Sequence, residues 1–319
     1  MNTNLLRTLV YIAALCGLYL STAMLVPAMV DLYYRDDNWS VFTVSAAMVG
    51  GISLTAAMAT RGPPPAFSKR MGFLLVNVLW AVFSVVGAIP LYFADLDLTF
   101  AQALFESISG ITTTGSTVIS GLDNIAPGIL MWRSLLAWLG GIGIVALGLF
   151  VLPFLRVGGM SFFKMESSDT GDKPFARLAT FTRAFMAVYV GITLACIIAY
   201  DFAGMSHFDA INHAFSTVAT AGFSTHDMSF AYFDSYSILW ISTFFMTVCS
   251  LPFSILIVFV IRGRLDALRD PQIFIFLAYV AAFALAGGIY NHLQNDIALP
   301  IALTHSFFNF TSILSTTGF

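Results

Sequence analysis

Charged side chains are scarce in this sequence, since only 10% of its 319 residues are Asp, Glu, Lys or Arg, against about 25% in soluble globular domains. Hydrophobic residues make up 58% of the chain, and its mean hydropathy is +0.86. A water-soluble domain needs far more polar surface to cover its core, so this composition excludes that class. It predicts an integral protein of the lipid bilayer, in which apolar side chains face lipid.

Cysteine is also rare. The chain has 3 cysteines, Cys16, Cys196 and Cys249, and each lies inside an apolar run with no other cysteine nearby. Zinc sites and disulfide frameworks are recognised by several cysteines at characteristic spacings. We therefore predict buried structural thiols, and neither a disulfide nor a zinc site.

Seven apolar runs are long enough to cross a bilayer as helices, which takes roughly 20 residues. They cover approximately residues 5–30, 39–60, 73–93, 131–154, 184–202, 237–261 and 273–290. The fourth run contains Gly140, Gly141, Gly143 and Gly148. Small residues of this kind predict close packing against neighbouring helices.

The basic residues predict the orientation of these spans. With the N-terminus in the cytoplasm, every Lys and Arg except Arg35 and Arg133 falls on the cytoplasmic side, as is usual in membrane proteins. Arg133 is then expected to anchor its span at the outer interface. Acidic residues gather toward the outer face, either because they attract cations to a vestibule or because Lys and Arg are excluded there.

Three shorter segments between the spans repeat one pattern, centred on Gly115, Gly222 and Gly318. A serine lies six residues before each glycine, at Ser109, Ser216 and Ser312. A threonine lies two residues before each glycine, at Thr113, Thr220 and Thr316. A polar residue lies nine residues before each glycine, at Glu106, His213 and Asn309. Each segment is predicted to be a short helix and a Thr/Gly loop that enters and leaves the membrane by its outer face.

Such loops have a chemical use. Non-helical backbone is tolerated at membrane depth only where it lines a cavity or is buried in protein, and loop carbonyls on one axis can replace the water around a potassium ion. Glycine permits φ above zero, hydroxyls bond neighbouring backbone, and the negative C-terminal end of each short helix favours a cation. We therefore predict a potassium-binding filter, with Ser109, Ser216 and Ser312 as support. The filter residues are Thr112, Thr113, Thr114, Gly115, Thr220, Ala221, Gly222, Thr316, Thr317 and Gly318.

The sequence resembles the TrkH branch of the Trk/Ktr/HKT potassium transport proteins in three kinds of stretch. They are the loops at 112–115, 220–222 and 315–318, the stretch 138–143, and the cytosolic 155–160 with Glu166, Ser167 and Ser168. The resemblance implies an all-α integral membrane fold, in which membrane-pore-membrane repeats surround a pseudo-fourfold pore axis after two extra N-terminal transmembrane helices. It implies potassium uptake across a bacterial inner membrane, with K⁺ as the transported ion and no cofactor in this chain. It also implies a homodimer and a cytosolic nucleotide-binding regulatory subunit of the TrkA type. Glycine at all three filter positions is implied to suit potassium rather than sodium.

That family has four repeats, and this sequence departs from it in extent. We expect two leading helices in 1–62, a first pore repeat in 63–160, a second in 161–265 and part of a third in 266–319, with the fourth absent. Three loops would leave one side of an ion site open. We therefore expect residues 1–319 alone to be a non-conducting fragment of a longer product.

Two other function classes were weighed. An enzyme could use His207, Asp209, His213, His226 and Asp227, but His213 occupies the repeat position of Glu106 and Asn309, so we predict no enzymatic activity. A proton- or sodium-coupled secondary transporter usually has ionisable residues at mid-membrane and inverted repeats, whereas these repeats run in one direction. No stretch resembles a nucleotide-binding loop. We expect the lipid bilayer, and no nucleic acid, as a partner of the chain.

Overall fold

The computed structural model describes residues 3–62, 69–155, 174–263 and 269–319. Within these ranges the regular elements are helices, with no β-strand among them. The long helices are α1 (Thr3–Ala23), α3 (Trp39–Thr60), α4 (Lys69–Phe93), α6 (Pro127–Leu155), α8 (Pro174–Phe202) and α12 (Pro271–Asn295). The shorter helices are α2 (Leu25–Tyr34), α5 (Phe100–Ile111), α9 (His207–Val218), α10 (Tyr236–Cys249), α11 (Phe253–Arg262) and α13 (Leu299–Leu314), with single turns η1 (Leu122–Asn124) and η2 (Ser229–Phe233).

Five of the seven predicted spans correspond to stretches that are long and apolar enough to cross a bilayer. They are Asn4–Tyr34, Trp39–Thr60, Arg70–Phe93, Thr182–Phe202 and Pro271–Asn295. The predicted span at 131–154 lies within α6, a continuous helix of 29 residues. The chain is therefore an all-α integral membrane protein, as its composition predicts.

The predicted span at 237–261 is wrong as one continuous helix. α10 ends at Cys249 and α11 begins at Phe253, because Pro252 has no N–H for the helical ladder and disfavours helical geometry at Leu251. The first span is also interrupted, at Met24, just before Pro27. Proline therefore accounts for both breaks, and the first stretch still reaches from Asn4 to Tyr34.

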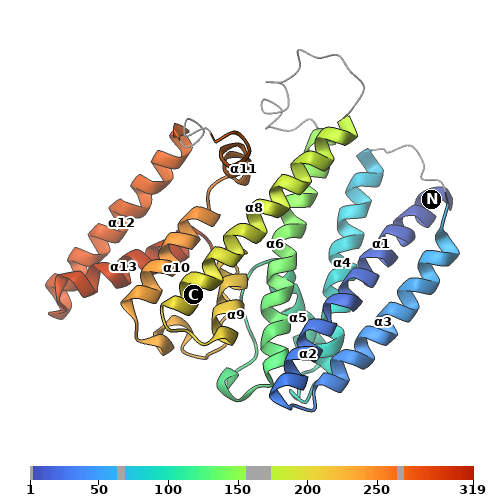
Figure 1. Ribbon diagram of the computed structural model, residues 1–319, viewed down its shortest axis with the longest axis horizontal. Coiled ribbons are helices and arrows are strands. Elements are labelled where there is room, and N and C mark those ends of the chain that lie inside the picture. The colour runs from blue at the N-terminus through green and yellow to red at the C-terminus, as the bar shows by residue number, and fades with distance from the viewer. Residues whose placement is uncertain (1–2, 63–68, 156–173, 264–268) are drawn as a thin grey trace.

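α1, α2 and α3 lie at one end of the molecule, with α3 outermost and α1 between α3 and α4, and α12 and α13 lie at the other end (Figure 1). Each short helix of the repeat packs against the long helix before it: α5 on α4, α9 on α8 and α13 on α12. Two of these pairs share a buried hydrogen bond, from Ser107 to the Ser84 carbonyl at 2.8 Å and from Ser306 to the Ala284 carbonyl at 2.7 Å. The C-terminal ends of the short helices, where the loops begin, are positioned by this packing.

The starts of the first two short helices carry local capping signals. Thr99 and Gln102 form a reciprocal capping box at α5. Ser206 accepts a hydrogen bond from the Asp209 N–H at α9. Such caps satisfy N–H groups that have no partner within the helix. The local sequence therefore explains why both helices begin where they do.

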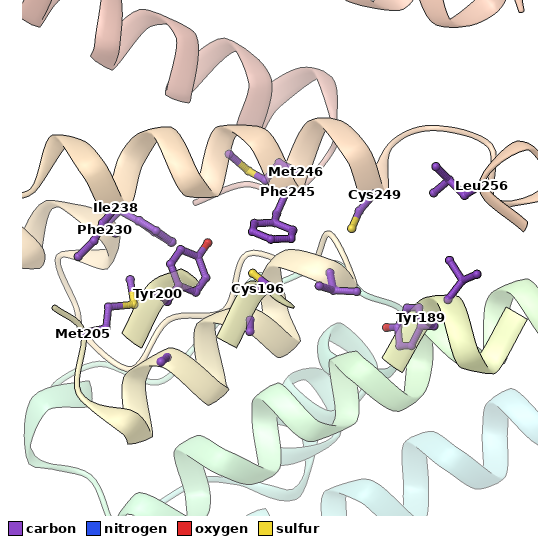
Figure 2. Close-up of a cluster of buried hydrophobic side chains, with 14 of the residues drawn as sticks. Tyr189, Cys196, Tyr200, Met205, Phe230, Ile238, Phe245, Met246, Cys249 and Leu256 are labelled. Carbon is purple, nitrogen blue, oxygen red and sulfur yellow. The ribbon is translucent and has the colours of Figure 1, made fainter. Parts of the chain in front are cut away.

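The largest buried cluster joins α8 to α10 and α11. Tyr189, Cys196 and Tyr200 of α8 face Met246 and Cys249 of α10 (Figure 2). Cys196 and Cys249 are buried and unpaired, as predicted, whereas Cys16 is only partly buried. The stretch 156–160, with Glu166, Ser167 and Ser168, lies outside the described residues.

Candidate functional site

The three Thr/Gly loops begin at the C-terminal ends of α5, α9 and α13 and fold in the same way. We call residues 112–117 the first loop, 219–224 the second and 315–319 the third. In each, the residue before the glycine donates its N–H to the carbonyl of the repeated serine. The bonds are Thr114 to Ser109 at 2.8 Å, Ala221 to Ser216 at 2.9 Å and Thr317 to Ser312 at 2.9 Å. The helix end thus sets the path of the loop.

The backbone of each loop is left-handed at two repeated positions. The predicted glycines have φ of 75° at Gly115, 85° at Gly222 and 85° at Gly318. The threonines two residues earlier are also left-handed, with φ of 56° at Thr113, 50° at Thr220 and 60° at Thr316. A β-branched residue with positive φ is a backbone outlier, and such strain clusters at functional sites. Repetition in all three loops shows that the conformation belongs to the motif.

Neighbouring loops come into close contact through their glycines. A Cβ placed on Gly115 would overlap the carbonyl oxygen of Ala221, and one on Gly222 would overlap that of Thr317. A Cβ on Gly318 would meet no described atom within 4 Å. The first loop therefore abuts the second, and the second abuts the third, with no room for a side chain at Gly115 or Gly222.

The serines support the loops differently from what we predicted. Their carbonyls hold the loops in all three copies, whereas the hydroxyls of Ser109 and Ser216 are buried without a hydrogen-bond partner in the described part of the chain. Only the Ser312 hydroxyl accepts a bond from its glycine, at 3.1 Å from the Gly318 nitrogen. A backbone carbonyl is available from any residue, so in the first two loops the serine side chain is not what fixes the loop.

Hydroxyl pairs also distinguish the loops. Thr112 and Thr114 pair through their hydroxyls at 2.8 Å, and Ser315 and Thr317 do so at 2.7 Å. The second loop has alanine at both corresponding positions, Ala219 and Ala221, and both are buried. These two alanines belong to a small apolar cluster with Ala137 and Phe223.

The polar residue nine positions before the glycine contacts residues two or three positions after the glycine. Glu106 accepts hydrogen bonds from the Thr117 hydroxyl at 2.8 Å and the Val118 N–H at 3.1 Å. His213 lies 3.0 Å from the Ser224 hydroxyl. Thr117 and Ser224 both lie two residues after the glycine. In the first two repeats the predicted shared position therefore joins the short helix to the outgoing end of its own loop.

Arg133 corrects the expectation of an anchor at the outer interface, because only 2% of its surface is exposed. Its Nε lies 2.7 Å from Glu106 Oε1, its Nη1 donates to the Ser224 carbonyl at 3.3 Å, and its guanidinium lies 4.3 Å from the centroid of the Phe223 ring. The pairing of Arg133 with Glu106 was not predicted from the sequence. An arginine within an apolar helix was the available signal, because such residues are usually paired and functional.

Close approach of α6 to the loops explains two of its glycines. A Cβ on Gly140 would overlap the Ile111 carbonyl at the end of α5. A Cβ on Gly141 would lie 2.6 Å from the Tyr189 hydroxyl and 3.4 Å from the Ala219 Cβ. The packing role predicted for these glycines is confirmed at both positions.

The outer segments that follow the first two loops are clamped together by charged groups. His226 Nδ1 lies 2.5 Å from Asp123 Oδ1, and its Nε2 lies 3.3 Å from Asp209 Oδ1, near enough for an ion pair although not aligned as a hydrogen bond. The Gly121 N–H donates to Asp227 at 3.0 Å. The hydrogen bond from His226 lowers the pKa of Asp123 below its ordinary value. We call these residues, His226, Asp123, Asp209, Asp227 and Gly121, the outer clamp.

The histidines and acids that an enzyme could have used are thus divided between separate contacts. His213 of α9 contacts the second loop, His226, Asp209 and Asp227 belong to the outer clamp, and His207 pairs with Asp201. Among the described residues no group of three or more His, Cys, Asp or Glu side chains is suited to hold a metal ion.

The chain is similar in sequence to a known protein family and to several of its members. Residues 42–285 match the family described as TrkH, cation transport protein. The chain is 35% identical over 309 residues to the Trk system potassium uptake protein TrkI of Halomonas elongata, covering 97% of this chain and 63% of that protein. It is 36% identical over 324 residues to the Trk system potassium uptake protein TrkH of Escherichia coli K12, covering 98% and 66%.

A solved structure is also similar. The crystal structure of the potassium transporter TrkH from Vibrio parahaemolyticus matches with a TM-score of 0.88 and 33% sequence identity, covering 98% of this chain and 64% of that one. The chain therefore spans less than two-thirds of the length of these relatives, between 63% and 66%.

Proposed function

This chain belongs to the TrkH family of cation transport proteins, and we propose that it contributes three sides of a potassium-selective pore for uptake across a bacterial inner membrane. The potassium uptake proteins among its relatives support the choice of ion. Its residues bind no cofactor in this proposal, and K⁺ is the transported ion.

One observation carries the proposal: three loops with the same left-handed positions lie in contact in chain order. Carbonyl groups of residues 112–115, 220–222 and 316–318 would line the ion path and replace the ion's water shell. The negative ends of α5, α9 and α13 adjoin these loops and favour a cation. The absence of space beside Gly115 and Gly222 would keep the carbonyls, rather than side chains, next to the ion.

The organisation of the chain is part of the same proposal. Residues 1–62 would form the two leading helices, 63–160 and 161–265 two pore repeats, and 266–319 part of a third. The distribution of Lys and Arg supports a cytoplasmic N-terminus. The name "Trk system" of the relatives supports several components, and we propose a homodimer with a cytosolic nucleotide-binding regulatory subunit.

Gly222→Ser tests the filter. The natural gene product and the variant would be expressed in a bacterial strain that lacks potassium uptake, and rubidium influx would be measured in competition with K⁺ and Na⁺. We expect the preference for K⁺ over Na⁺ to fall by about tenfold or more, because the new side chain disturbs the carbonyl ring.

Gly204→Ser is the matched control. Gly204 also has a positive φ, 101°, but a Cβ there would meet nothing within 4 Å, and it lies outside the loops. This variant should retain the natural ion preference. An unchanged K⁺/Na⁺ preference in Gly222→Ser, with normal protein levels in the membrane, would remove the second loop from the filter.

A further inference from the structure

The pair formed by Glu106 and Arg133 places two charges deep in the protein behind the loops. Both side chains are at least 98% buried, with relative exposures of 2% for Arg133 and 0% for Glu106. A guanidinium stays protonated in proteins, so its positive charge must be compensated locally. Removing one partner of such a pair leaves an uncompensated charge in a medium that screens it poorly.

Arg133 contacts both of the first two loop units. Through Glu106 it is linked to Thr117 at the end of the first loop. Through Nη1 it reaches the Ser224 carbonyl at the end of the second loop, and its guanidinium stacks on Phe223. The position of this one cation is therefore determined by two loops that abut each other at Gly115 and Ala221.

Glu106 provides the largest negative charge next to Arg133, and Asp227 contributes a smaller one. Its third nitrogen, Nη2, is buried without a hydrogen-bond partner among the residues that the structure describes, and Nη1 binds a neutral carbonyl. The other two repeats have His213 and Asn309 where the first has Glu106. α10, the helix after the second loop, contains no Lys, Arg, Asp or Glu. The charge pair is thus particular to the first unit.

We propose that Glu106 acts as a charge-balancing residue for the ion path: it neutralises the Arg133 guanidinium that joins the first two loops, and so keeps their carbonyls attractive to a cation. This inference rests on the proposed function and adds to it a determinant of ion affinity outside the loops. In this role Glu106 prevents the charge of Arg133 from repelling the transported ion.

Glu106→Gln tests the charge, because it keeps the size and hydrogen-bonding capacity of the side chain. The measurement is the apparent KM for K⁺, obtained by competition with rubidium uptake, in the natural gene product and in the variant. This KM does not depend on the amount of protein in the membrane. We expect the KM to rise about tenfold, since an unbalanced positive charge lowers the local concentration of cations.

The double variant Glu106→Gln with Arg133→Gln separates charge from structure. Charge balance predicts that its KM returns to within about threefold of the natural value, because neither charge is left alone. A merely structural role predicts a double variant at least as impaired as Glu106→Gln. Gly204→Ser is the control here too, since Gly204 lies outside the loops and the change leaves both charges, so its KM should stay natural.

Two outcomes would overturn the inference: a natural KM in Glu106→Gln, or a KM in the double variant that stays as high as in the single one. If Glu106→Gln does not accumulate in the membrane, the double variant decides, because charge balance requires it to accumulate and to transport with a near-natural KM. The proposed function is tested separately by the ion preference of Gly222→Ser. Loss of preference there with an unchanged KM in Glu106→Gln would defeat only the charge-balancing role.

Discussion

Behind the first loop lies a buried ion pair, Glu106 with Arg133 at 2.7 Å, whereas the second loop has His213 in the equivalent position, 3.0 Å from the Ser224 hydroxyl. The two loops nevertheless share their backbone conformation at the glycine and at the threonine before it. Both receive the same carbonyl support from the end of their short helix. The same loop geometry can therefore be supported by a charged pair or by a histidine hydrogen bond, because the carbonyl at the end of the short helix supports both loops in the same way.

The two loops also differ in how their own side chains are used. The first pairs the hydroxyls of Thr112 and Thr114, while the second buries Ala219 and Ala221 against Ala137 and Phe223. Phe223 also carries the Arg133 guanidinium on its face. The second loop is thus packed tightly between α6 and the first loop, so its positions 219 and 221 have room only for small residues. Two pairs of variants and one single variant examine this comparison, from the largest expected effect to the smallest.

The largest effect is expected from removing Arg133. Arg133→Ala leaves the Glu106 carboxylate buried without its partner, which costs about 3–5 kcal/mol in comparable pairs. The matched change in the second unit is Ser224→Ala, which deprives His213 of its hydroxyl contact and should cost only about 1–3 kcal/mol. The midpoint of unfolding by sodium dodecyl sulfate in detergent micelles measures both. Equal losses in the two variants would mean that the first loop does not depend on charge.

An exchange of side chains between the loops should be asymmetric. Ala221→Thr adds atoms at a position with 0% exposure, and such overpacking costs about 1–3 kcal/mol. The reverse exchange, Thr114→Ala, removes one hydroxyl pair from an exposed side chain and should cost less than about 1 kcal/mol. The same unfolding assay compares them. A Thr114→Ala variant that is less stable than Ala221→Thr would show that hydroxyl pairing outweighs packing.

The outer clamp should have the smallest effect. His226 lowers the pKa of Asp123, so the Asp123 contact stabilises the fold fully above about pH 4 and is lost as the pH falls through the lower folded pKa. Asp123→Asn should therefore lower the unfolding midpoint slightly at pH 7, and the difference from the natural protein should shrink as the pH falls below about 4. Solvent screens this half-exposed group, so the effect stays small.

If the unfolding midpoints of Asp123→Asn and the natural protein differ more as the pH is lowered toward about 3, the Asp123 contact does not lose its effect at low pH and the prediction is wrong. Raised salt gives a control, because screening weakens the exposed Asp123 contact much more than the buried pair of Glu106 and Arg133.

Much of the fold could be predicted because it depends on local sequence. Apolar runs of sufficient length identify the spans, and the repeated glycine at 115, 222 and 318 marks residues that do have positive φ. Pro252 is a local signal too, and the break between α10 and α11 could have been predicted from it. The left-handed threonines could not, since threonine has no intrinsic preference for that conformation, and the surrounding packing imposes it.

The contacts of the site required the folded chain. Nothing near Arg133 in the sequence points to Glu106 or Ser224, which lie on other elements and meet it only after α5, α6 and the second loop have packed together. The same holds for the contact of Gly115 with Ala221 and for the unused hydroxyls of Ser109 and Ser216. Backbone conformation and membrane insertion follow from neighbouring residues and from composition, whereas pairing partners depend on which distant surfaces come into contact when the helices pack.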